Sequence, residues 1–219
     1  MHTITSQPAR HGRIASVAMA LSLAAMPVQG ASQEWIFRVF LGEQEVGEHR
    51  FRLDQRAEGT LLRSQARMNV KLLGFNAFSY VHDATERWTG DCLDRIESQT
   101  DRNGRPYAVT GERTDEGFRV QTLKATEALP RCIMSFAYWN PKILGQRQLL
   151  NPQTGEYVDV SVESKGMETI TARGTTVDAR RYTLVGRKLR IDVWYARDGT
   201  WVGLESMTDA GRVLRYVRT

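Results

Sequence analysis

The stretch that decides the fold is the C-terminal run of residues 188–219, KLRIDVWYARDGTWVGLESMTDAGRVLRYVRT. From Leu189 to Val193 apolar residues alternate with charged ones, and this period of two is typical of a half-buried strand. The interruptions at 197–200 and 209–212 each contain an aspartate and a glycine, which suit tight turns because glycine accepts a positive φ without steric cost. The stretch therefore predicts a meander of three antiparallel strands.

Alternating apolar and polar residues predict further strands at residues 34–41, 46–53, 61–73, 75–88, 93–100, 107–112, 118–123, 157–162, 168–172 and 176–184. Asn103-Gly104 lies between two of these strands and is the strongest short signal for a hairpin. Residues 124–131 are short of β-branched side chains and end beside Pro130. They are expected to form a helical turn or a loop, as a hinge between two half-sheets.

The predicted fold class is therefore all-β, with a single antiparallel, strongly curved sheet or (half-)barrel of about ten or more strands. The expected strands at 61–73 and 75–88 are longer than usual, which favours strong curvature or a barrel wall. Residues 31–219 are expected to form this one β domain, because no linker, low-complexity tract or long helical period interrupts them. Closure of the sheet and oligomeric state stay open.

Residues 1–30 are typical of a cleaved signal peptide. Arg10 and Arg13 precede an apolar run at 14–28, and small residues surround Gly30. The run is shorter than the about 20 residues that cross a bilayer, and no transmembrane segment is expected in the mature protein. The alternative is a buried core helix, which would keep a polar face that this run lacks. We therefore expect an exported protein, in the periplasm if the cell has an outer membrane.

Cys92 and Cys132 are the only cysteines of the chain. An even number of cysteines in an oxidising compartment favours a disulfide, and the alternative is two separate buried thiols. Two distant cysteines supply too few ligands for a zinc site, so no metal is expected.

The charge pattern argues against nucleic acid as a partner. The net charge is +5, and two of the arginines responsible lie in the predicted signal peptide. A mild basic excess in an exported protein indicates solvated strand faces, with an anionic surface as the alternative. The chain contains no dinucleotide fingerprint or phosphate-binding glycine-rich loop, so no cofactor is expected.

His82, Asp83 and Glu86 form the only cluster of imidazole and carboxylate groups in the sequence. Along a strand Asp83 points away from His82, so the two side chains do not share a face. This arrangement favours a hydrogen-bonded wall histidine over a catalytic one. Because no nucleophile elbow is present either, the sequence leans against an enzyme and assigns no catalytic residue.

The most unusual stretch is 132–150, where aromatic residues precede basic ones. Aromatic rings can cover the tail of an amphiphile while cations at a rim pair with an anionic head. The candidate ligand-binding residues on this hypothesis are Phe136, Tyr138, Trp139, Lys142 and Arg147. The competing explanation is that these aromatic side chains simply fill the end of the barrel.

Several motifs resemble a family of exported bacterial domains of unknown function. They are the aromatic-led first strand, the stretch SFAYWN at 135–140, and the closing elements at 192–195, 198–199, 204–205, 211–212 and 214–216. The resemblance implies an antiparallel, curved or barrel-like sheet and brings no established activity. A more distant likeness in fold is to periplasmic carriers of lipids and lipoproteins.

The leading hypothesis for function is a non-enzymatic cell-envelope protein that binds a lipid or other amphiphile within its curved sheet. One alternative is a hydrolase-type enzyme of the envelope whose catalytic groups no motif reveals. Another is a structural β module that binds a protein partner through a sheet edge.

Overall fold

The computed structural model describes residues 1–3, 30–72, 75–208 and 211–219, so the predicted signal peptide lies almost wholly outside the described residues. The strands are β1 (Ser32–Leu41), β2 (Gln44–Arg56), β3 (Gly59–Leu72), β4 (Phe75–Thr89), β5 (Cys92–Arg102), β6 (Arg105–Arg113), β7 (Phe118–Thr122), β8 (Thr126–Leu129), β9 (Gln148–Leu150), β10 (Tyr157–Asp159), β11 (Ser161–Ala172), β12 (Thr175–Gly186), β13 (Leu189–Ala196), β14 (Trp201–Met207) and β15 (Val213–Arg218). A 3-10 helix, η1, spans Pro141–Gly145.

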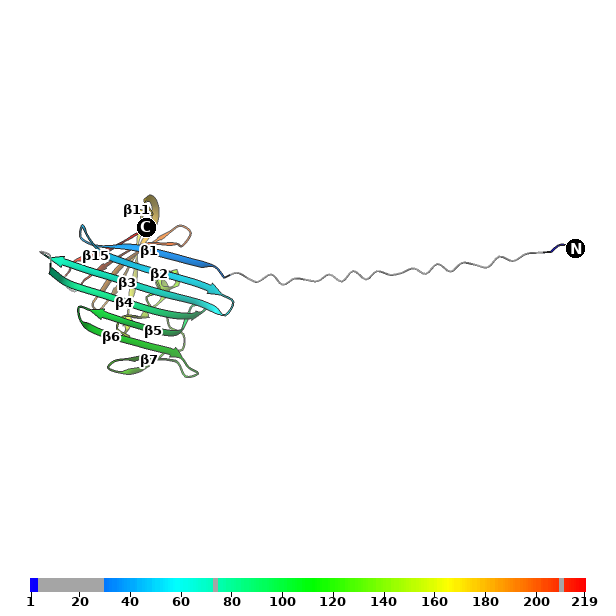
Figure 1. Cartoon of the computed structure of the whole chain (residues 1–219), viewed down its shortest axis with the longest axis horizontal. Coiled ribbons are helices and arrows are strands. Elements are labelled where there is room, and N and C mark those ends of the chain that lie inside the picture. The colour runs from blue at the N-terminus through cyan, green and yellow to red at the C-terminus, as the bar shows by residue number, and fades with distance from the viewer. Residues whose placement is uncertain (4–29, 73–74, 209–210) are drawn as a thin grey trace.

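One antiparallel sheet of 13 strands dominates the molecule, in the order β11-β12-β13-β14-β15-β1-β2-β3-β4-β5-β6-β7-β8. Two meanders, β1–β8 and β11–β15, join where β1 pairs with β15, with Phe37 opposite Arg218 and Leu41 opposite Leu214. Figure 1 shows the sheet wrapping strongly around an interior. The prediction of an all-β protein with one antiparallel, strongly curved sheet is confirmed.

One local prediction is wrong. Residues 124–131 were expected to form a helical turn or a loop, but they contain β8, which pairs with β7 from Phe118 opposite Leu129 to Gln121 opposite Thr126. The amide of Thr122 donates to the carbonyl of Ala125 and closes the turn between the two strands at 2.8 Å. The backbone hydrogen bonds of this hairpin outweigh the weak strand propensity of its residues.

After β8 the chain leaves the sheet and follows residues 130–160, which we call the crossing segment. It is tied to the sheet by a hydrogen bond of 2.9 Å from the amide of Leu93 to the carbonyl of Ile133. Within the segment, the amide of Phe136 donates to the carbonyl of Leu150 at 3.1 Å. Its apolar residues Ile133 and Leu149 are buried in the same core as the inward-facing residues of the strands. The crossing segment therefore fills part of the sheet's interior.

The main core consists of large aromatic rings on the inner face. Phe37 lies 4.5 Å from Trp201 between ring centroids, and Phe51 lies 5.0 Å from Trp201 in an edge-on contact. These residues lie on β1, β2 and β14, which are far apart in sequence and close in the sheet order. Since each ring is nearly inaccessible to water, burial of these side chains contributes about 2 to 3 kcal/mol apiece to folding.

The alternation at 191–195 predicts a half-buried strand, whereas all five of these residues are buried. The reason is that β11 and β12 cover the outer face of this part of the sheet. Ala172, Ala179, Trp194 and Val202 form a small apolar cluster there. The terminal methyl carbon of Ile170, Cδ1, would lie only 3.2 Å from a Cβ at Gly203. Both faces of β13 are therefore buried.

The predicted disulfide is present. Cys92 and Cys132 are bonded, with their Cα atoms 4.8 Å apart, and they link the start of β5 to the crossing segment. Within the described ranges, no helix is long and apolar enough to cross a membrane.

Candidate functional site

A band of polar side chains crosses the inner face of the sheet between two apolar clusters. We call it the polar layer; its members are His49, Ser64, Tyr80, His82, Thr100 and Tyr216. They point inward because successive side chains of a strand alternate between the two faces, and their neighbours Glu48 and Val81 are exposed. The registers align His49 with Ala66, Ala66 with His82 and His82 with Thr100, so neighbouring strands bring the polar groups together.

Both histidines of the polar layer have one ring nitrogen engaged with a hydroxyl. His49 Nε2 lies 2.8 Å from Ser64 Oγ, and His82 Nδ1 lies 2.8 Å from Thr100 Oγ1. The two imidazole rings are 6.3 Å apart between centroids. These contacts fix the orientation of both rings against the wall of the sheet.

Two buried polar atoms of the layer have no hydrogen-bond partner within the described part of the chain. They are His49 Nδ1 and the hydroxyl of Tyr80, and both side chains belong to residues that are only 8% exposed. An unsatisfied buried polar group costs about 1 to 3 kcal/mol. Buried polar groups are nearly always satisfied by protein, water or ligand. Other buried atoms, among them Trp35 Nε1 and Trp139 Nε1, also have no partner among the described residues, but the two atoms of the polar layer lie in one group of side chains, which makes this layer the candidate site.

The polar layer is electrically neutral near pH 7. Burial lowers the pKa of His82 to about 4 and the pKa of His49 to well below its usual range. Burial also raises the pKa of the Tyr80 and Tyr216 phenols far above the usual value. The layer therefore offers uncharged donors and acceptors. Among the residues that the structure describes, no three His, Cys, Asp or Glu side chains gather closely enough to hold a metal ion.

Beyond the polar layer, toward the turn between β1 and β2, the inner face is apolar. We call this surface the apolar wall; its buried members are Val39, Leu41, Val46, Ala66 and Met68. Val70, Phe78 and Leu214 pack against it and are only partly buried, so they lie on its solvent side. Polar groups next to an apolar surface make an environment suited to an amphiphile.

On the opposite side of the polar layer, Glu86 holds the crossing segment. Its carboxylate accepts hydrogen bonds from Trp88 Nε1 at 3.1 Å and from Ser135 Oγ at 3.0 Å. Burial raises the pKa of Glu86 to about 7, although both hydrogen bonds oppose this rise. Glu86 is thus a buried carboxyl group that joins β4 to the crossing segment.

The structure places the three predicted aromatic residues of the crossing segment in or against the main core. The ring of Phe136 lies 6.2 Å from that of Tyr138, and Tyr138 lies 5.4 Å from Trp201. Trp139 contacts Trp88 edge-on at 5.6 Å. Tyr138 is the one that borders the polar layer, since Tyr216 contributes, after burial, to raising the pKa of its phenol.

The two predicted cations lie on the surface. Lys142 Nζ pairs with Asp91 Oδ2 at 2.6 Å, and Asn140 Nδ2 donates to the same carboxylate at 3.1 Å. Arg147 is exposed. Ligand binding by the five predicted residues stays a prediction, and Lys142 serves locally to fix the start of η1 against the β4–β5 turn.

The sequence singles out His82 but not the side chains that surround it. As expected, Asp83 points away from it, because the outward carboxylate of Asp83 binds Arg67 at 2.8 Å. His49, Tyr80 and Tyr216 were not selected as site residues. The signal that could have found them is their place at inward positions of adjacent strands, which becomes visible only when the pairing registers are known.

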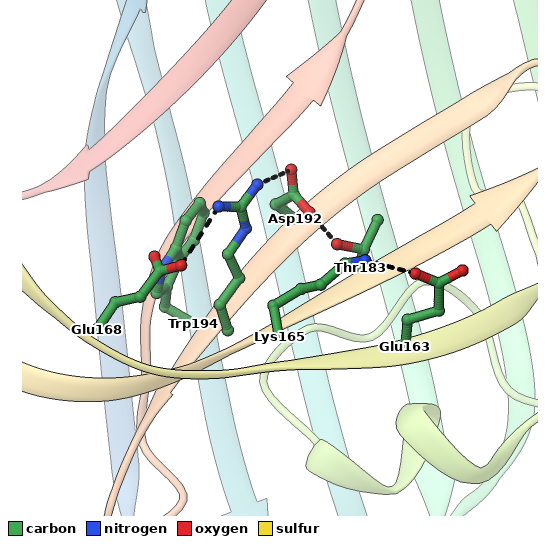
Figure 2. Close-up of polar contacts among 7 residues, drawn as sticks. Glu163, Lys165, Glu168, Thr183, Asp192 and Trp194 are labelled. Atoms are coloured by element: carbon green, nitrogen blue, oxygen red, sulfur yellow. Dashed lines mark hydrogen bonds and ion pairs between the residues drawn. The ribbon is translucent and has the colours of Figure 1, made fainter.

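A second, partly buried polar cluster lies on the outer face, where β11 covers part of β12 and β13. We call it the outer clamp; its members are Glu168, Arg181, Thr183, Asp192 and Trp194 (Figure 2). Arg181 Nη2 donates to Asp192 Oδ2 at 3.0 Å, and Arg181 Nη1 lies 3.3 Å from Glu168 Oε1. The same guanidinium lies over the ring of Trp194, 5.3 Å from its centroid. The charged side chains of the outer clamp thus form ion pairs among themselves.

A charged hollow of about 470 Å³ lies on the outer face of β1–β3. Its lining combines Arg50, Arg52, Arg56 and Arg63 with acidic side chains. Arg63 Nη1 binds the carboxylate of Asp54 at 2.8 Å. Glu34 and Asp54 are the two acidic residues of the lining, so its four arginines leave it positively charged on balance.

Comparison with known proteins agrees with the fold. A family model described as "Domain of unknown function (DUF6134)" matches residues 37–219. A similar solved structure is the crystal structure of a β-barrel-like protein of the domain of unknown function DUF1849 from Brucella abortus, with a TM-score of 0.64, 10% sequence identity, and coverage of 89% of this chain and 97% of that chain. At this identity the likeness shows the fold alone. No curated protein matches the sequence.

Proposed function

Since the chain belongs to the DUF6134 family, whose description assigns no activity, we propose a function from the residues of the chain itself. The protein is an exported component of the cell envelope that binds a lipid or other amphiphile on the inner side of its curved sheet and catalyses no reaction. The polar layer receives the polar part of the ligand, and the apolar wall receives its chain.

One observation carries this proposal: His49 Nδ1 and the Tyr80 hydroxyl are buried and unpartnered among the described residues, directly beside an apolar surface. Without a ligand, these unsatisfied groups lower the free energy of unfolding, and no contact within the described residues compensates for the loss. A ligand that combines a hydrogen-bonding head with an apolar tail would satisfy both atoms. The half-buried Val70, Phe78 and Leu214 lie at the edge of this apolar surface, where the ligand would enter.

The geometry supports binding rather than catalysis. The Nδ1 atom of His82 is occupied by Thr100, and the neighbouring carboxylate of Asp83 lies on the other face. A general base needs a proton-accepting atom within reach of a substrate and an orienting partner on its other side. On the inner face the partner of His82 Nδ1 is the hydroxyl of Thr100. His82 therefore lacks the carboxylate partner that would raise the basicity of its ring.

Two observations support export. Strand β1 begins at Ser32, immediately after the predicted cleavage region around Gly30, so removal of residues 1–30 would leave the sheet whole. The bond between Cys92 and Cys132 suits an oxidising compartment. Intact mass measurement on protein recovered from cell fractions tests this point; a mass that retains residues 1–30 in the cytoplasmic fraction would contradict export.

The ligand hypothesis is tested by purifying the full chain from its own host under mild conditions, followed by native mass spectrometry and extraction of bound lipids. We expect an amphiphile to co-purify and to be released on unfolding. If nothing co-purifies and delipidated protein binds no acyl-chain compound of any head group, the proposal fails.

A further inference from the structure

We propose that the polar layer selects an amphiphile with an uncharged, hydroxyl-bearing head, which lies between His49 and Tyr80 while the tail follows the apolar wall. This inference rests on the proposed function and names the chemical class of its ligand. Monoacylglycerols and long-chain alcohols belong to this class, whereas fatty acids at neutral pH do not.

The two unpartnered atoms lie in one continuous group of rings. The ring of His49 is 6.3 Å from that of His82, and His82 is 6.3 Å from Tyr80 in a stacked arrangement. Tyr216 lies 5.9 Å from His49 on the other side. Its phenol also helps to raise the pKa of Tyr80, after burial, so it lies near both unpartnered groups. The rings of His49 and Tyr80 thus both contact the ring of His82, which places the two unpartnered groups in the same part of the polar layer.

The hydrogen-bonding chemistry of these atoms fits a hydroxyl group. The phenol of Tyr80 both donates and accepts, and His49 Nδ1 donates in one tautomer and accepts in the other. If His49 Nε2 donates to Ser64 Oγ, Nδ1 is an acceptor, and if Nε2 accepts from Ser64 Oγ, Nδ1 is a donor. The serine hydroxyl can play either role. A hydroxyl head satisfies every combination, because it also donates and accepts. A carboxylate or phosphate oxygen only accepts.

Charge discriminates further against an anionic head. The imidazoles of the polar layer are neutral, and the guanidinium of Arg67 is turned outward to Asp83. Arg102 is opposite Tyr80 on β5, but it already has an interaction of its own, and its influence on the pKa of Tyr80 is smaller than that of burial. A buried carboxylate without a cation is strongly disfavoured, whereas a hydroxyl loses little when it finds hydrogen bonds.

The apolar wall can adapt to a tail. Met68 on the wall is unbranched and flexible, and methionine fills irregular spaces more readily than other apolar side chains. Phe78 and Leu214 are only partly buried at the solvent side of the same cluster. Displacement of these side chains would open the wall without disturbing the main core around Trp201.

The test compares two ligands with the same acyl chain, 1-monopalmitoylglycerol and palmitate, on delipidated full-length protein by isothermal titration and native mass spectrometry at about pH 7, where palmitate is ionised. We expect the monoacylglycerol to bind about tenfold or more tightly than palmitate, because its hydroxyl satisfies buried groups that the carboxylate leaves unsatisfied or meets only at the cost of burying its charge. Equal binding, or tighter binding of palmitate, would overturn the head-group inference and leave the proposed function standing.

The variant Tyr80→Phe links the selectivity to the polar layer. We expect it to weaken monopalmitoylglycerol about three- to tenfold, to leave palmitate nearly unchanged, and to leave the ligand-free protein as stable as the wild type or more stable. Tyr195→Phe is the matched control, because the hydroxyl of Tyr195 already donates to the carbonyl of Tyr138 at 2.8 Å. It should lower stability and leave affinity unchanged.

Two further outcomes are decisive. If Tyr80→Phe changes neither affinity, and a crystal structure shows ordered water on Tyr80 and His49 with ligand bound elsewhere, the polar layer is a water site and the inference is wrong. If neither ligand binds and nothing co-purifies from the host, the proposed function itself fails.

Discussion

The polar layer and the outer clamp are two polar clusters on opposite faces of one sheet, and they are built in opposite ways. In the outer clamp, the guanidinium of Arg181 forms ion pairs with the carboxylates of both Glu168 and Asp192. In the polar layer the groups are neutral, and His49 and Tyr80 each keep an atom without a partner among the described residues.

The difference separates a cluster of paired charges from a layer that keeps polar atoms without partners among the described residues. The outer clamp fastens β11 and β12 over β13, where the sheet buries both faces. Its one unpartnered atom, Arg181 Nε, belongs to a side chain that already makes two ion pairs. In the outer clamp, Trp194 Nε1 on β13 donates to Glu168 Oε2 on β11 at 3.0 Å, which joins two strands that are not neighbours in the sheet. The hydrogen bonds of the polar layer join only strands that the backbone already pairs.

The largest expected effect comes from breaking the outer clamp. Arg181→Ala leaves the buried Asp192 without its cation and should lower the free energy of unfolding by about 3 kcal/mol. Urea unfolding measures the change. Arg180→Ala is the control, because Arg180 is exposed one residue earlier on the same strand, and its effect should stay within about 0.5 kcal/mol. Equal effects of the two substitutions would show that the outer clamp carries no stability.

A somewhat smaller effect should appear when charge enters the interior. The folded-state pKa of Glu86, about 7, lies above its ordinary value of 4.5. The carboxyl group therefore contributes stability that is fully present below about pH 4.5 and is lost as pH rises through about 7. Relative to Glu86→Gln, the wild type should lose about 2 to 3 kcal/mol between these values.

Urea unfolding of both proteins across that pH range checks the prediction. The comparison at each pH cancels the opposite contribution of the histidines, whose lowered pKa values remove stability as pH falls from about 6.5 to 4. Parallel stability curves for the wild type and Glu86→Gln would contradict the assignment of a buried, nearly uncharged carboxyl group.

The smallest expected change in stability comes from removing single hydroxyl groups. Tyr195→Phe leaves the carbonyl of Tyr138 without its donor and should cost about 1 kcal/mol, whereas Tyr80→Phe removes an unpartnered hydroxyl and should cost nothing or stabilise by a similar amount. Thermal unfolding of the ligand-free variants gives the sign of each change. A loss of stability in Tyr80→Phe would mean that its hydroxyl has a partner in solution.

Local patterns predicted much of the fold. Alternation indicated strands in both meanders, and the pairing of Cys92 with Cys132 followed from their number and compartment. The outward direction of Asp83 relative to His82 follows from the geometry of a strand alone. These features depend on residues close together in the sequence or on the number of cysteines, and both can be read from a single sequence.

The remaining features depend on contacts between distant residues. Strand β8 forms because β7 supplies its backbone partners, and β13 is buried on both faces because Ile170 and its neighbours reach over Gly203. The polar layer needs the registers of β2 to β5, which place His49 and His82 on either side of Ala66 on the inner face. No local period encodes these registers, so the candidate site was missed although each of its residues was visible.

The central claim is that the unpartnered groups of the polar layer belong to a ligand site. The most direct measurement is a crystal structure of the full-length protein purified from its own host without delipidation. We predict elongated density that begins between His49 Nδ1 and the Tyr80 hydroxyl and continues along the apolar wall past Met68. Isolated water molecules at those two atoms, with Met68 and Val39 packed closed against each other, would contradict the account.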